Sequence, residues 1–234
     1  MRAVLIDLDD TLLDHTSSSR AALSAVCRAN PALAALPFAE VLADHAAILE
    51  ELHREVLRGA CSLDAARTER FRRLLTRHGA DADPALAAAC YRATYQAARQ
   101  AVPGALALLE QLRGRAAVAV VSNNVQAEQE EKLRRLGMHH LIDVLVVSET
   151  VGVAKPDPAI FAAALRQLGC AAADAVMVGD SWATDVLGAR AAGVRAVWLN
   201  RHGFPCPDPA LAHELSTLEP TAVVGELLLG RGVA

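Results

Sequence analysis

Short runs of apolar, often β-branched residues recur along the chain. An uninterrupted run of this kind predicts a strand buried on both faces. The runs are AVLI (3–6), VAVV (118–121), VLVV (144–147), AVMV (175–178) and RAVWL (195–199). From the second run onward, amphipathic helical segments separate each run from the next, namely VQAEQEEKLRRLG, DPAIFAAALRQLG and TDVLGARAAG. Such strand–helix–strand units predict an α/β fold, a Rossmann-like parallel sheet with helices on both faces.

The interval from residue 15 to residue 100 lacks this alternation. Its apolar side chains instead recur every three or four positions, as at Val41, Ile48 and Leu52, which predicts helices. We expect four of them, near residues 16–29, 38–58, 62–78 and 84–99. The α/β core then resumes with VPGALALLEQLRG, in which Pro103 predicts a helix start. The predicted domains are therefore a discontinuous core, residues 1–14 and 101–234, and a helical domain at 15–100.

Composition limits the classes of partner and the cellular locations that we expect for this chain. The chain has 234 residues, of which 53% are apolar, and a formal charge of −4 without any basic, aromatic-rich run, so we expect no nucleic acid partner. Its five cysteines form no C-x-x-C pair, which favours free thiols over disulfides or a zinc site. Acids occur too early for a signal peptide and no apolar stretch could span a bilayer. We expect a cytoplasmic protein with no membrane association.

Polar residues that could carry chemistry follow the predicted strands directly. They are Asp7, Asp9 and Asp10 after the first, Ser122, Asn123 and Asn124 after the second, Lys155 beyond the third, and Asp180 and Asp185 after the fourth. Ligands of parallel sheets bind outside the carboxyl ends of the strands, so these side chains converge on one edge. Carboxylates, a lysine and a hydroxyl are the groups needed to bind a divalent cation such as Mg²⁺ together with a phosphate.

Each of these residues also has an ordinary explanation when it is taken alone. Asp9 could cap a turn, Lys155 could be a solvated charge before a proline, and Ser122 could cap a helix. Their joint position at successive strand ends favours the functional interpretation. For Asp10 we keep the ordinary one, because strand alternation turns its side chain away from its neighbours. The chain has no G-x-x-x-x-G-K-[ST], G-x-G-x-x-G or H-E-x-x-H motif.

Four stretches in order, DLDDTL, VVSNN, KPDP and GDSWATD, resemble the signature motifs of the haloacid dehalogenase superfamily. Most members of that superfamily are Mg²⁺-dependent phosphatases. The resemblance covers residues 1–14 and 101–205. The helical segment at 15–100 is similar, in position and length only, to the cap domain that many members insert after the first strand.

The resemblance implies a role for each matching residue. Asp7 would be the nucleophile and Asp9 the general acid/base, while Ser122 and Lys155, with Asn123 beside them, would bind the substrate phosphate. The chemistry needs the same groups, because a carboxylate can attack phosphorus and a second acid can protonate the leaving oxygen and then deprotonate water. Two residues apart on an extended chain, Asp7 and Asp9 would face the same side.

The metal ligands implied by the resemblance are Asp7 and Asp180, and we count Asp9 with them. Asp185 would be a further acid near the Mg²⁺ ion, acting either as a direct ligand or by orienting another ligand. Trp182, inside the same loop, is a candidate for the rim of the substrate pocket; the alternative is a packing role.

These residues predict a Mg²⁺-dependent phosphomonoester hydrolase that acts through an aspartyl phosphate on a small phosphorylated metabolite of the nucleotide or sugar phosphate class. A phosphomutase of the same superfamily would keep all four motifs. A metal-independent 2-haloacid dehalogenase would use Asp7 to displace halide from carbon and needs neither a metal nor a second acid; such enzymes typically lack the acid found here as Asp9. A non-catalytic binding or regulatory module would not need an intact nucleophile, acid and metal site. Substrate selectivity is expected to reside in the helical segment, which closes over the site in capped members.

Overall fold

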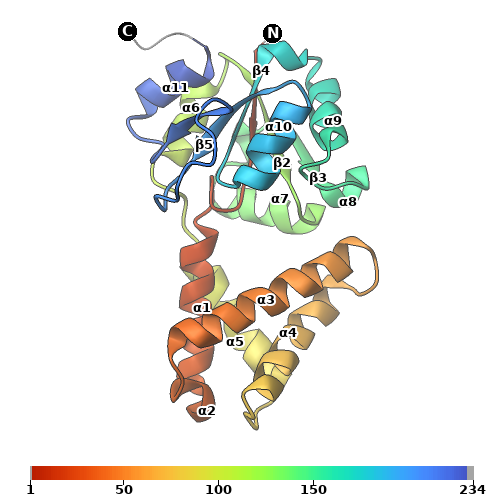
Figure 1. Cartoon of the computed structure of the whole chain (residues 1–234), viewed down its shortest axis with the longest axis vertical. Helices are drawn as coiled ribbons and strands as arrows, with labels where there is room; N and C mark the ends of the chain where they lie inside the picture. Colours follow the sequence, from red (N-terminus) through yellow and green to blue (C-terminus); the bar gives the residue numbers. More distant parts are fainter. Residues whose placement is uncertain (1, 231–234) are drawn as a thin grey trace. The chain divides into compact units, whose positions relative to one another are not determined.

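The computed structural model describes residues 2–230 and divides into two compact units (Figure 1). One unit contains the residues up to 14 together with those from 100 onward, and the other contains residues 15–99. The sequence-based division placed residue 100 with the helical segment. In the structure it lies with the sheet, where the Gln100 carbonyl accepts a hydrogen bond from the Asp14 backbone N–H at 3.0 Å.

The first unit is built on a six-stranded, fully parallel sheet with the strand order β3-β2-β1-β4-β5-β6. The strands are β1 (Ala3–Ile6), β2 (Ala117–Ser122), β3 (Val144–Val147), β4 (Ala175–Gly179), β5 (Arg195–Leu199) and β6 (Ala212–Leu215). The five predicted strands and the parallel α/β fold are confirmed. The sequence missed β6, AHEL, because this edge strand is only partly buried and its side chains are mixed in polarity.

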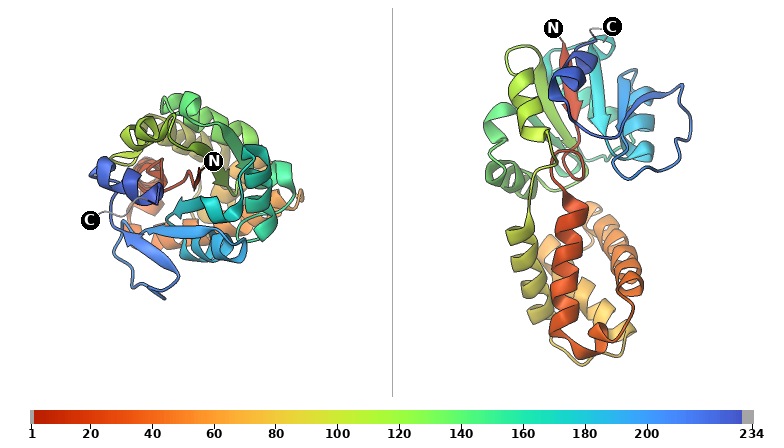
Figure 2. Two further views of the ribbon diagram at one scale, coloured as in Figure 1. Left: turned by 90° about the horizontal axis from the view of Figure 1, so that it is seen from above. Right: turned by 90° about the vertical axis from the view of Figure 1, so that its left-hand side faces the viewer.

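Helices cover both faces of the sheet (Figure 2). They are α6 (Ala105–Leu112), α7 (Gln126–Arg135), α8 (Ser148–Val151), α9 (Pro158–Leu168), α10 (Leu187–Ala191) and α11 (Thr221–Leu228), with short turns η1 (His139–Leu141), η2 (Ala172–Asp174) and η3 (Trp182–Val186). Strand alternation divides the core: Ile6 packs with Leu109 of α6 and Leu133 of α7, whereas Leu5 packs with Phe161 of α9.

Two helix starts differ from the sequence-based expectation. Pro103 does not open a helix, because Gly104 follows it in the left-handed region (φ 82°) as the N-cap, and α6 begins at Ala105. The segment TDVLGARAAG is not one α-helix; its beginning belongs to η3, a π-helical turn, and α10 follows from Leu187. π-Helical turns are often found at functional sites, and this one begins two residues after Asp180.

The second unit is entirely helical within residues 15–99. It contains α1 (His15–Ala29), α2 (Pro31–Ala34), α3 (Phe38–Leu57), α4 (Leu63–Arg77) and α5 (Pro84–Ala98). The four predicted helices are confirmed, and the single turn α2 is additional, capped by the Asn30 side chain. α1 and α5 lie side by side (Figure 2). Leu23, Phe71, Leu74 and Tyr91 are among the side chains of a core separate from that of the sheet.

No helix within residues 2–230 combines the length and the apolar character that crossing a membrane requires.

Candidate active site

The site lies at the carboxyl ends of the three central strands. The parallel register places Ile6 of β1 opposite Val120 of β2 and Val178 of β4. Asp7, Ser122 and the Gly179–Asp180 pair therefore reach the same edge of the sheet. The Asp7 backbone N–H still donates to the Val178 carbonyl at 2.9 Å, so the sheet holds this residue rigidly.

Lys155 joins two buried carboxylates. Its Nζ lies 2.5 Å from Oδ1 of Asp7 and 2.6 Å from Oδ1 of Asp185. The Asn123 side chain holds the backbone of Lys155 on both sides, since its Oδ1 accepts from the Lys155 N–H at 2.6 Å and its Nδ2 donates to the Lys155 carbonyl at 2.9 Å. The loops after β2 and β3 are therefore tied together so that the ammonium faces Asp7.

Burial is the main cause of the unusual ionisation of this cluster. It raises the pKa of Asp7 to about 7, with repulsion from Asp185 and Asp9 adding to the effect while Lys155 opposes it. Burial and the Asp7 and Asp185 charges likewise raise the pKa of Asp180 to about 8. Burial alone lowers the pKa of Lys155, but Asp185 and Asp7 outweigh it and raise that pKa above its ordinary value. The cluster therefore has a deficit of positive charge.

The carboxylates of Asp7, Asp180 and Asp185 fit a hard divalent cation. Each offers an oxygen, and the three oxygens lie within 4.8 Å of one another. Oxygen ligands in this number are what Mg²⁺ takes from proteins, the rest of its coordination being water and substrate phosphate. Asp9 does not join this cluster through its side chain, which contacts α7 instead.

Asp180 and Asp185 are positioned by their surroundings. The Asp180 backbone N–H donates to Oγ1 of the buried Thr11 at 3.1 Å, and Trp198 Nε1 donates to the Asp180 carbonyl at 2.7 Å. The Asp185 carboxylate packs against Gly179 so closely that a Cβ there would lie 2.1 Å from Oδ2. Only glycine at 179 leaves room for this carboxylate.

Asp9 is held by α7. Nζ of Lys132 lies 2.7 and 2.9 Å from its two carboxylate oxygens, and Nε2 of Gln129 donates to Oδ2 at 3.0 Å. The same Gln129 nitrogen lies 2.5 Å from Oγ of the predicted phosphate ligand Ser122. Sequence reasoning missed both residues, because α7 is rich in charge. A signal was present: Gln129, Lys132 and Leu133 have the i, i+3, i+4 spacing of a buried face.

Two other residues singled out by the sequence make contacts within the sheet unit, and the position of Trp182 at the rim of the substrate pocket stays a prediction. Asp10 occupies the left-handed region (φ 62°), and its N–H donates to the Leu13 carbonyl at 2.7 Å, so it shapes the turn after β1. Asp and Asn tolerate this conformation better than most residues. Trp182 packs edge-on against Trp198, with ring centroids 5.2 Å apart.

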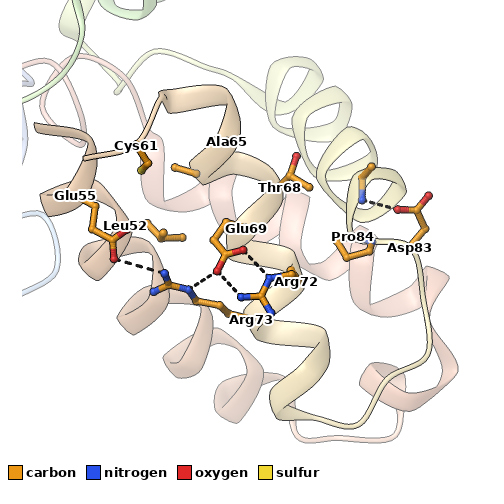
Figure 3. A pocket seen from close by; sticks show the side chains of 12 residues that line it. Leu52, Glu55, Cys61, Ala65, Thr68, Glu69, Arg72, Arg73, Asp83 and Pro84 are labelled. Atoms are coloured by element: carbon orange, nitrogen blue, oxygen red, sulfur yellow. Dashed lines mark hydrogen bonds and ion pairs between the residues drawn. The ribbon is translucent and has the colours of Figure 1, made fainter. Parts of the chain in front are cut away.

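The helical unit contains a cavity between α3, α4 and the start of α5 (Figure 3). Four of its charged lining residues pair with one another: Glu69 accepts from Arg72 and Arg73, and Arg73 also contacts Glu55. The fifth, Asp83, caps α5 by accepting from the Ala85 N–H at 2.8 Å. Both guanidinium groups that line this cavity are therefore already paired with carboxylates.

Known proteins resemble this chain over most of its length. A family model described as haloacid dehalogenase-like hydrolase matches residues 1–193. The glyceraldehyde 3-phosphate phosphatase of Methanopyrus kandleri is 37% identical, covering 89% of this chain and 88% of that protein. The phosphoserine phosphatase of Thermus thermophilus is 35% identical, covering 92% and 94%. The magnesium-bound crystal structure of the HAD-hydrolase YfnB from Bacillus subtilis superposes with a TM-score of 0.77 at 26% identity, covering 96% and 98%.

Proposed function

Because this chain belongs to the haloacid dehalogenase-like hydrolases, we propose that it is a Mg²⁺-dependent phosphomonoester hydrolase that works through a phosphorylated Asp7. The observation that carries the proposal is the pairing of Asp7 with Lys155 at the edge of the sheet, 2.5 Å apart, beside Asp180 and Asp185. This arrangement offers a nucleophile, a phosphate ligand and a cation site within one buried cluster.

In the first half-reaction, a carboxylate oxygen of Asp7 attacks phosphorus while the bond from phosphorus to the leaving oxygen breaks. Asp9, protonated for this step, donates its proton to that oxygen, so the leaving group departs as an alcohol. Lys155 holds the attacking carboxylate in place and stabilises its charge. The product on the enzyme is an acyl phosphate on Asp7.

In the second half-reaction, Asp9 is a carboxylate and takes a proton from water as the water oxygen attacks phosphorus. The bond from phosphorus to the Asp7 oxygen breaks, releasing inorganic phosphate and regenerating Asp7. Two carboxylates therefore divide the chemistry between nucleophile and proton carrier.

Ser122, Lys155 and Asn123 are the proposed substrate-binding residues. Ser122 and Lys155 would donate to phosphate oxygens, where charge accumulates during phosphoryl transfer. Asn123 acts by holding the Lys155 loop, as its two hydrogen bonds to that backbone indicate.

Asp7, Asp180 and Asp185 are the carboxylates that would hold Mg²⁺, and Asp9 as a fourth ligand stays a prediction. Mg²⁺ bound there would supply the positive charge that the cluster lacks and would neutralise the substrate phosphate. The resident oxygens suit this ion, because all three are carboxylate donors.

The substrate is proposed to be a small phosphorylated metabolite of the nucleotide or sugar phosphate class, selected by the helical unit acting as a cap. The relatives named above are phosphatases of glyceraldehyde 3-phosphate and of phosphoserine, so these two esters belong in a first substrate panel. Phosphomutase and 2-haloacid dehalogenase remain the alternatives, and no observation in the structure favours either of them.

The test is a phosphate-release assay with 4-nitrophenyl phosphate and the metabolite panel. We expect activity with Mg²⁺, loss in excess chelator and recovery on adding Mg²⁺ back. Full activity in chelator would overturn the proposed cation requirement. A parallel assay with 2-chloropropionate should release no chloride, whereas metal-independent chloride release would establish the dehalogenase alternative.

A further inference from the structure

Two polar side chains of α7 lie inside the sheet unit. Gln129 is fully buried, and the Lys132 side chain is only 2% exposed. Their i, i+3 spacing puts them on one face of the helix. Lysine is almost never buried to this extent unless it is paired. We call Gln129 and Lys132 the α7 pair.

The α7 pair contacts the second of the two carboxylates assigned to chemistry. Lys132 spans both oxygens of Asp9, at 2.7 and 2.9 Å, and Gln129 adds a donor at 3.0 Å. Lys155, in turn, holds Asp7. Each reacting carboxylate thus has its own lysine, from a different segment of the chain. Because the two lysines come from different segments, Lys132 holds Asp9 in position independently of the contact between Lys155 and Asp7.

Gln129 links Asp9 to Ser122. Its Nε2 donates to Asp9 and to Ser122 Oγ, and the carboxylate requires this orientation of the amide because it can only accept. Since Ser122 Oγ accepts a hydrogen bond from Gln129, its own hydrogen is left to donate to an anionic ligand. The cost is a buried Gln129 Oε1 without a hydrogen-bond partner among residues 2–230.

We propose that the α7 pair consists of positioning residues for phosphoester hydrolysis. Lys132 positions the Asp9 carboxylate for proton transfer, and Gln129 orients the Ser122 hydroxyl toward the substrate phosphate. Neither residue exchanges a proton or forms a bond with the substrate. The inference rests on the function proposed above and adds two residues to its machinery. A misplacement of about 1 Å in such a group can cost about 10²-fold in rate.

Lys132→Met keeps the length of the side chain and removes its charge. For an alkyl phosphate such as ethyl phosphate, we expect kcat to fall about 10²-fold with KM nearly unchanged, since proton transfer to the leaving oxygen is impaired. For 4-nitrophenyl phosphate, which needs no protonation to depart, the fall should be much smaller. Lys132→Arg should restore most of the rate on ethyl phosphate.

The double variant Lys132→Met/Asp9→Asn tests whether Lys132 acts through Asp9. It should be no slower on ethyl phosphate than Asp9→Asn alone, because the group that Lys132 positions is already disabled. Multiplicative losses, or equal losses of Lys132→Met on the two esters, would overturn the role of Lys132. If Lys132→Met does not fold, Lys132→Gln, which also removes the charge, replaces it in the same comparison.

Gln129→Met tests the link to Ser122. We expect a higher KM for both esters, similar to the KM of Ser122→Ala. The double variant Gln129→Met/Ser122→Ala should show no further rise in KM. Unchanged KM in Gln129→Met would overturn this half of the proposal. Arg135→Met is the matched control, because Arg135 is exposed on the same helix and pairs only with Glu131 in the contacts that we describe (2.7 Å). Its kcat and KM should equal those of the wild type.

Failure of this inference is distinguishable from failure of the proposed function. An inactive Asp7→Asn together with a Lys132→Met that slows both esters equally leaves the function standing and removes the inference. An Asp7→Asn variant with wild-type phosphate release removes both.

Discussion

At the scale of single residues, the structure gives two chemically identical side chains different surroundings. Asp7 is buried against Lys155 and Asp185, whereas Asp9 lies against Lys132 and Gln129. In the proposed mechanism, the first environment serves the nucleophile beside the cation site, and the second serves the carboxylate that exchanges protons. Asn substitutions separate the two roles because Asn is nearly isosteric with Asp.

Asp7→Asn should abolish turnover in a folded protein, since the attacking oxygen anion is gone. Asp9→Asn should be slower than the wild type by about 10²- to 10⁴-fold on alkyl phosphates and less affected on 4-nitrophenyl phosphate. With the aryl ester, Asp9→Asn should accumulate phosphorylated Asp7, because nothing activates water. Intact-mass measurement after rapid quench checks this. An adduct in Asp7→Asn, or wild-type alkyl phosphate rates in Asp9→Asn, means that the roles are assigned to the wrong residues.

At the scale of secondary-structure elements, close packing between helix and loop fixes the position of Lys155. α10 approaches the residue after it: a Cβ on Gly188 would lie 2.9 Å from Cα of Pro156 and 2.7 Å from the Phe161 ring of α9. A glycine within a helix normally costs about 1 kcal/mol relative to alanine. At Gly188 the closeness of backbone and ring explains why glycine is nevertheless present.

Gly188→Ala should lower the free energy of unfolding by about 1–3 kcal/mol, because the added methyl group forces neighbouring backbone to move. It should also lower the phosphatase rate, since Lys155 precedes the displaced Pro156. Gly225→Ala in α11 is the matched control: its Cβ would lie 2.9 and 3.4 Å from Oε1 and Cδ of Gln111, the end of a flexible side chain, and 3.9 Å from Cδ1 of Leu108. Urea unfolding should show the control unchanged or up to about 1 kcal/mol more stable. Equal stabilities of the two variants would contradict this account.

At the scale of the whole molecule, the two units have separate cores and separate spectroscopic reporters. Both tryptophans, Trp182 and Trp198, belong to the sheet unit, and both tyrosines, Tyr91 and Tyr95, belong to the helical unit. The core of the helical unit also encloses His45, whose ring packs against Phe71 and Tyr91. Acid should therefore act on the two units differently.

Burial, with the charges of Arg70 and His15, lowers the pKa of His45 to about 3, against about 6.5 in an unfolded chain. Below pH 6.5 the unfolded chain binds a proton that the folded unit excludes, so the free energy of unfolding falls as the pH falls. Between pH 7 and pH 5 this term amounts to about 2 kcal/mol.

We therefore expect the free energy of unfolding of the wild-type helical unit to fall between pH 7 and pH 5. Thermal unfolding followed by second-derivative tyrosine absorbance measures this loss. The loss should be smaller by about that amount in His45→Phe and His45→Leu. Tryptophan absorbance reports the sheet unit in the same samples. The same pH dependence in the wild type and in both variants would show that His45 is not the group responsible.

The sequence alone determined most of the elements, because their hydrophobic periodicity is local information. Runs such as AVLI and AVMV predict buried strands whatever lies beside them, and Phe71 and Leu74 mark a helix by spacing alone. It also indicated Asp7, Ser122, Lys155 and Asp180, because parallel strands end at one edge. The missing elements, β6 and α2, have weak local patterns: β6 is a partly exposed edge strand, and α2 is a single turn set by the Asn30 cap.

Only the tertiary structure decided how the side chains of the site are paired. Lys132 lies 123 positions from Asp9 and Lys155 lies 148 from Asp7, so no local pattern could show which lysine serves which carboxylate. In sequence, α7 has the charge content of an exposed helix, and packing against the sheet determined that Gln129 and Lys132 face inward. The cost of burying an amide and an ammonium is met only where a carboxylate and a hydroxyl receive them, and folding alone brings those groups together.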